Sequence, residues 1–119
     1  MSPQRSVLIV DESDESREVL RTALTRLGTR IYEARQAAEG LELARTCRPD
    51  VIVLDLELHG GDSDWGEFEA AARQRRTPLV IIGSARRAGM RVPGGQFIEK
   101  PYHYAPLVRR IEDLLGEPL

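Results

Sequence analysis

The chain has 119 residues with nearly balanced charge: 17 basic and 19 acidic side chains give a formal net charge of −2. This length suits one domain, spanning residues 1–119, and the charge balance argues against generic affinity for nucleic acid. Cys47 is the only cysteine, which excludes an intrachain disulfide and a zinc cluster built from thiolates, and fits a reducing, cytoplasmic setting. The apolar runs are too short to cross a membrane.

Three continuous apolar runs, at residues 7–10, 51–54 and 79–82, predict strands buried on both faces, as in a parallel sheet. Residues 31–34 and 96–99 are weaker candidates for further strands. Helical periodicity fills most of the intervals, and the alternation predicts a doubly wound α/β fold. The apolar stripes are Val19, Leu20, Ala23, Leu24 and Leu27; Ala37, Leu41 and Ala44; Phe68, Ala71 and Ala72; and Leu107, Val108, Ile111, Leu114 and Leu115.

Two features, Gly28 and residues 85–95, mark where helices are expected to end or to be missing. Gly28 follows the first stripe and is a typical helix stop. Residues 85–95, between the fourth and fifth strands, hold three Gly and one Pro and carry no apolar stripe. At most one helical turn is therefore expected there, so the helix at this place is predicted to be truncated or missing.

The basic residues are also unevenly divided, because 16 are Arg and one, Lys100, is Lys. A compact ammonium and a planar guanidinium are not interchangeable at a tight site. The count alone leaves two interpretations open, a functional lysine and a nucleotide bias of the genome.

Polar side chains follow four of the predicted strands. Asp11 and Glu12 follow the first strand, Asp55 the third, Ser84 the fourth and Lys100 the fifth. Ligands of open parallel sheets bind beyond the carboxyl ends of the strands, so these groups are expected to converge. Crowded carboxylates suit Mg²⁺, and a phosphoryl group beside the metal would use a hydroxyl and an ammonium. Asp55, ending a central strand, is the candidate nucleophile.

Each of these residues also has a simpler interpretation. Asp11, Glu12, Asp14 and Glu15 could form an acidic first helical turn favoured by the helix dipole. The polar residues after the other strands could be ordinary turn, capping and solvated side chains. The convergence of four strand ends is more specific than any of these residues alone.

The segments around these residues resemble the receiver domain of two-component response regulators (CheY-like). The acidic first-strand motif is matched by VLIVDES, with Arg17 and Leu20 at the usual places of the first helix. The other matching segments are RPDVIVLDLEL, IIGSA and FIEKPYHYAPLVRRI. The resemblance covers essentially the whole chain. It implies a flavodoxin-like, five-stranded parallel sheet with strand order 2-1-3-4-5.

The resemblance implies that Asp55 accepts a phosphoryl group from a sensor histidine kinase or a histidine phosphotransfer protein. It implies Mg²⁺ held by Asp11, Glu12, Asp55 and the backbone carbonyl of Glu57. The chain would be a stand-alone phosphoprotein switch of a two-component system or phosphorelay. It would assist its own phosphorylation and dephosphorylation without being a turnover enzyme. A partner protein or a second copy of the chain would read its state, with no nucleic acid or membrane involved.

The resemblance also assigns a switch. Lys100 would pair with the phosphoacceptor and then with the phosphoryl oxygens, and its bond to Pro101 would be cis. Ser84 would move to the phosphoryl group and Phe97 would follow it inward, while Ala85 would leave room for the phosphate.

The chain departs from the family pattern at several positions. Glu12 replaces the commoner Asp, His59 replaces the usual Pro, and Phe97 lacks the hydroxyl of the commoner Tyr. Residues 60–66, GGDSDWG, are interpreted as a small, acidic insertion before the third helix. The short separation between Ser84 and Lys100 suggests that phosphorylation is reported by an unusual surface.

Two flanking positions, Glu57 and Arg86, lie where receivers tune the lifetime of the phosphoryl group. Their opposite charges suggest a lid over that group. The alternative is two solvated side chains, whose exposed pair would contribute well under about 1 kcal/mol.

Two other functions remain open at this point. A degenerate receiver would bind partners without phosphorylation, although the acid, Asp, Ser and Lys set is complete. An aspartate-nucleophile phosphatase of the haloacid dehalogenase type would need a second Asp two places after the nucleophile. Glu57 stands there, and the chain has no cap domain.

Overall fold

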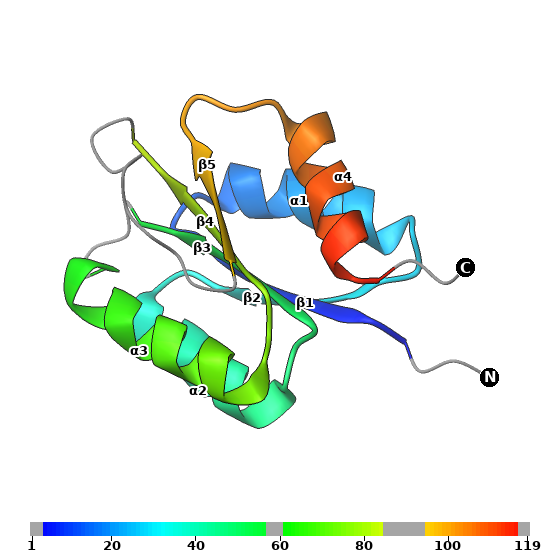
Figure 1. The fold of residues 1–119 in the computed structure, drawn as a ribbon. Helices are drawn as coiled ribbons and strands as arrows, with labels where there is room; N and C mark the ends of the chain where they lie inside the picture. The colour runs from blue at the N-terminus through cyan, green and yellow to red at the C-terminus, as the bar shows by residue number, and fades with distance from the viewer. Residues whose placement is uncertain (1–3, 57–60, 85–94, 117–119) are drawn as a thin grey trace.

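The computed structural model describes residues 4–56, 61–84 and 95–116. Its centre is a parallel five-stranded sheet with the order β2-β1-β3-β4-β5, as expected from the sequence (Figure 1). The strands are β1 (Ser6–Val10), β2 (Arg30–Ala34), β3 (Val51–Asp55), β4 (Leu79–Gly83) and β5 (Gly95–Glu99). All residues of β1, β3 and β4 are buried, which explains their continuous apolar sequences.

Four helices in the described part of the chain cover the sheet in two pairs: α1 (Asp14–Thr25), α2 (Ala37–Cys47), α3 (Gly61–Arg75) and α4 (Tyr104–Leu114). Figure 1 shows α1 and α4 on one face and α2 and α3 on the other. Alternate strand residues serve the two faces. Leu8, Ile52 and Ile81 pack on the α2 and α3 side, whereas Val7, Val53 and Val80 pack on the α1 and α4 side.

The first helix ends earlier than its apolar stripe suggested. Leu20 and Leu24 are fully buried, but α1 ends at Thr25 and Leu27 is 50 % exposed. Gly28 has a φ of +82°, a left-handed conformation that glycine adopts at no steric cost. The stop was therefore predicted in the right place, but the assignment of Leu27 to the buried face was wrong, because that residue lies in the turn after the helix.

The interpretation of residues 60–66 as an insertion before the third helix is also wrong. The helix α3 already begins at Gly61, so residues 61–66 form its first turns. Asp62, Ser63 and Asp64 are residue types that a helix accepts at its amino end, where the backbone dipole favours negative charge. Glycine lowers helix propensity by only about 1 kcal/mol per residue, which packing of the later turns can offset.

Two further departures from the family pattern fall on residues that the structure does not describe. Residues 85–94, which carry the predicted truncated helix, and His59 lie outside the described residues. Within the described ranges, no helix combines the length and the apolar character that crossing a membrane requires.

Candidate functional site

The carboxyl ends of four strands lie at one edge of the sheet. The parallel register pairs Val10 with Leu54, Asp55 with Ile82, and Gly83 with Glu99. Asp11, Ser84 and Lys100 directly follow β1, β4 and β5, and Asp55 is the last residue of β3. The structure thus brings together residues that are far apart in the sequence, as expected for a parallel sheet.

Asp55 and Lys100 form the central pair of this edge. The Lys100 ammonium Nζ lies 3.0 Å from Oδ1 and 2.9 Å from Oδ2 of Asp55. The carboxylate is buried, and the lysine is about one-third exposed. The backbone N–H of Lys100 donates to the carbonyl of Gly83 at 2.8 Å, and the Lys100–Pro101 peptide bond is cis. A buried carboxylate at the end of β3 is therefore paired with the ammonium of the residue that follows β5.

Asp11 is a second buried carboxylate at the same edge, only 4 % exposed. The pKa of its carboxyl group is raised to about 6, chiefly by burial and also by the negative charge of Asp55. The backbone N–H of Ser13, which donates to Oδ1 at 2.9 Å, and the charge of Lys100 act in the opposite direction without cancelling the rise. Among the described residues, Asp11 and Asp55 thus lie near one ammonium, that of Lys100.

Three of the remaining candidates, Glu12, Ser84 and Phe97, are among the described residues. Glu12 is exposed, and Ser84 is partly buried next to β4. Phe97 is partly buried on β5 and packs against the α2 and α3 side of the core. Glu57, Ala85 and Arg86 lie outside the described residues. No three His, Cys, Asp or Glu side chains in the described ranges are grouped closely enough to hold a metal ion together.

A cavity of about 410 Å³ opens beside Lys100, between the site and α1. Tyr104 on α4 donates its hydroxyl to Oγ of Ser16 on α1 at 3.3 Å, and its ring meets that of Tyr102 edge to face. Burial raises the pKa of Tyr102 to about 12, so this phenol stays neutral at physiological pH. The cavity is lined by Ser16, Ser84, Lys100, Pro101, Tyr102 and Tyr104.

A larger cavity, of about 660 Å³, lies at the opposite end of the sheet. Its lining includes Arg48 and Asp50, which precede β3, and Thr77, which precedes β4. It therefore has no part in the chemistry of the strand ends.

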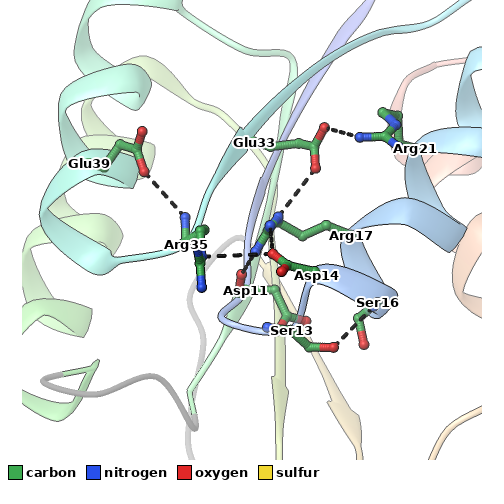
Figure 2. A network of polar contacts seen from close by, with 9 residues as sticks. All are labelled: Asp11, Ser13, Asp14, Ser16, Arg17, Arg21, Glu33, Arg35 and Glu39. Atoms are coloured by element: carbon green, nitrogen blue, oxygen red, sulfur yellow. Dashed lines mark hydrogen bonds and ion pairs between the residues drawn. The ribbon is translucent and has the colours of Figure 1, made fainter.

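Arg17 anchors the segment that carries Asp11, as Figure 2 shows. Its guanidinium donates to the backbone carbonyl of Asp11 at 2.6 Å and to Glu33 on β2 at 3.2 Å, and it pairs with Asp14. The sequence placed Arg17 in a motif without giving it a role. A signal was present, because Arg17 shares a helix face with Leu20 and Leu24, and a charge on a buried stripe requires partners.

The fold and the strand-end carboxylates define a receiver-type signalling domain. The response regulator receiver domain family matches residues 7–112, and the chain belongs to this family. It is 34 % identical to the transcriptional regulatory protein AfsQ1 of Streptomyces coelicolor, over 92 % of this chain and 51 % of AfsQ1. It is 37 % identical to the KDP operon transcriptional regulatory protein KdpE of Escherichia coli, over 89 % of this chain and 49 % of KdpE. The chain thus spans about half the length of these relatives.

Solved structures agree on the fold. A response regulator receiver protein from Sinorhizobium medicae superposes with a TM-score of 0.80 at 23 % identity, covering 95 % of both chains. A two-component response regulator from Clostridium difficile gives the same TM-score at 21 % identity, covering 94 % of this chain and 96 % of that one. At these identities the comparison shows the fold alone.

Proposed function

We propose that the chain is a phosphoacceptor switch of a two-component system or phosphorelay, in which Asp55 receives a phosphoryl group from the phosphohistidine of a kinase or phosphotransfer protein. The observation that carries this proposal is the Lys100 ammonium, 2.9 and 3.0 Å from the two oxygens of a buried carboxylate. A structural ion pair would need no further acidic group. Here a second buried carboxylate, Asp11, lies beside it and is left without a full counter-charge.

The donor set fits Mg²⁺. Asp11 and Asp55 supply buried carboxylate oxygens, the hard ligands that this ion prefers, and water and phosphate oxygens usually complete its coordination. Glu12 and the backbone carbonyl of Glu57 are proposed as further donors. When bound, Mg²⁺ supplies positive charge for phosphoryl oxygens.

The residues of the chain then have separate tasks. A carboxylate oxygen of Asp55 attacks phosphorus while the bond from phosphorus to the donor imidazole nitrogen breaks, and the electron pair leaves with the imidazole. Lys100, already beside Asp55, stays within reach of the phosphoryl oxygens and offsets their charge. Ser84 donates its hydroxyl to the phosphoryl group, and Phe97 follows as the switch residue. Glu57 and Arg86 remain candidates for tuning the lifetime of the phosphorylated state.

Intact-mass measurement tests this function directly. The chain is incubated with Mg²⁺ and acetyl phosphate, and its mass is compared with that of the Asp55→Asn variant. One phosphate adduct in the wild type, absent from the variant, supports the proposal. Turnover of phosphate esters without an adduct would instead indicate an aspartate-nucleophile phosphatase. If the measurement shows no adduct and no turnover, the chain is a degenerate receiver that acts by binding alone.

The partners follow from the same chemistry. A sensor histidine kinase or histidine phosphotransfer protein supplies the phosphoryl group, and a protein surface, including a second copy of this chain, reads the result. The curated relatives are named transcriptional regulators and are about twice as long as this chain.

A further inference from the structure

Arg17 is a buried arginine at the start of α1, outside the pair that handles the phosphoryl group. Its side chain is only 9 % exposed, although arginine is usually solvated. The planar guanidinium reaches three acceptors: the Asp11 carbonyl, Glu33 and Asp14 (Figure 2). A group buried in this way holds its neighbours in a single arrangement, because each acceptor occupies a separate N–H of the fork.

The main chain of Asp11 is held on both sides. Its N–H donates to the carbonyl of Ala34 on β2 at 3.0 Å, and its carbonyl accepts from Nη1 of Arg17 at 2.6 Å. Its carboxylate accepts from the backbone N–H of Ser13 at 2.9 Å. The direction of the carboxylate therefore depends on the peptide units on either side of it, and Arg17 is the side chain that fixes the second of these.

We propose that Arg17 is a positioning residue that sets the affinity of the acidic edge for Mg²⁺ by fixing the main chain of Asp11, without taking part in phosphoryl transfer. This inference rests on the proposed function, since it takes Asp11 as a metal ligand. Loss of a group that orients a metal ligand typically weakens metal binding by about 10- to 100-fold. The group that faces the phosphoryl oxygens, Lys100, makes its contacts with Asp55 and Gly83, not with Arg17.

Replacing Arg17 by Met disturbs little else. Glu33 keeps its second partner, Arg21, at 2.8 Å. The carboxylate of Asp14 is 71 % exposed, so water replaces its lost partner. Of the three acceptors, the buried carbonyl of Asp11 is the one that water does not readily reach. The chain also offers a matched control, since Arg21 shares Glu33, is 47 % exposed and makes its hydrogen bond to Glu33 rather than to Asp11.

Calorimetric titration with Mg²⁺ on the full chain tests this inference, using wild type, Arg17→Met, Arg17→Lys and Arg21→Met. We expect Arg17→Met to raise the Kd for Mg²⁺ about tenfold and Arg21→Met to change it less than about twofold. Arg17→Lys should raise the Kd by about threefold or more, because one ammonium cannot span the three acceptors. At saturating Mg²⁺, phosphorylation of Arg17→Met by acetyl phosphate should proceed at the wild-type rate to within about twofold.

Two results would overturn the inference. One is a folded Arg17→Met protein that binds Mg²⁺ as tightly as the wild type. The other is a variant whose phosphorylation rate stays low at saturating Mg²⁺, since this would show a general structural role. If circular dichroism shows that Arg17→Met does not fold, Arg17→Lys decides by the same criteria. A wild type that binds Mg²⁺ but forms no adduct refutes the proposed function alone, whereas a wild type that binds no Mg²⁺ refutes both.

Discussion

Asp11→Asn should stabilise the metal-free protein at neutral pH. The pKa of Asp11 rises from the ordinary value of 3.8 to about 6, chiefly through burial. A pKa raised in the folded state means that folding disfavours the charged carboxylate. The contribution of Asp11 to the free energy of unfolding is therefore greatest below pH 4 and falls as the pH rises towards 6. At about 1.4 kcal/mol per pKa unit, the loss above pH 6 is about 3 kcal/mol. Asn keeps an oxygen that can accept from Ser13 but carries no charge.

Urea unfolding in EDTA, followed by circular dichroism at pH 4 and pH 7.5, measures this effect. At pH 7.5 we expect the free energy of unfolding of Asp11→Asn to exceed that of the wild type by up to about 3 kcal/mol. At pH 4 this difference should shrink towards zero. The exposed Asp113, replaced by Asn, is the matched control and should show no such pH-dependent gain. An Asp11→Asn variant no more stable than the wild type at pH 7.5 would refute the reasoning that this carboxylate is held against its preference.

Two further substitutions test the site and the packing below it. Lys100→Arg keeps the charge but brings a planar fork to a carboxylate that now meets one ammonium at 2.9 and 3.0 Å, so phosphorylation of Asp55 by acetyl phosphate should slow roughly tenfold or more. Intact-mass time courses measure this, and wild-type kinetics would contradict it. A Cβ at Gly40 would lie 2.7 and 2.9 Å from the methyl groups of Val10, so Gly40→Ala should lower the free energy of unfolding by about 1–3 kcal/mol. Gly66 is also helical, but a Cβ added there would meet no atom within 4 Å outside its own helix backbone and chain neighbours, so it is the control. Gly66→Ala should stabilise by about 0.5–1 kcal/mol, and equal effects of the two changes in urea unfolding would contradict the packing argument.

The sheet could be predicted from the sequence because burial on both faces leaves a direct mark. In β1, β3 and β4 every position is buried, so every position is apolar or small until the strand ends. The strand order came from the resemblance to the receiver family. The amino end of α3 could not be predicted in the same way, since Gly61 and Gly66 weaken the helical signal and only packing of the later turns around Phe68 and Ala72 stabilises that helix.

The site was predictable to the extent that strand ends identify it. Asp11 and Asp55 each follow an apolar run, and Lys100 follows the weaker strand candidate at residues 96–99. Parallel pairing of the strands brings the three residues to the same edge of the sheet. The contacts of Arg17 could not be read from the sequence in this way. Its partner Glu33 lies on an edge strand, and their contact depends on how α1 packs across β1 and β2. Sequence periodicity places Arg17 on a buried face but does not say which acceptors meet it there.

The charge balance of the acidic edge connects its stability with its chemistry. Two buried carboxylates, Asp11 and Asp55, share the ammonium of Lys100, so the folded chain without a cation carries an unfavourable charge that the unfolded chain does not. A bound divalent cation reverses this balance and stabilises the fold by its own binding free energy. If Asp11 holds Mg²⁺ as proposed, its raised pKa reflects the free energy spent on keeping two carboxylates close together before the cation binds. A substitution that removes the charge of Asp11 should then weaken metal binding while it raises the free energy of unfolding.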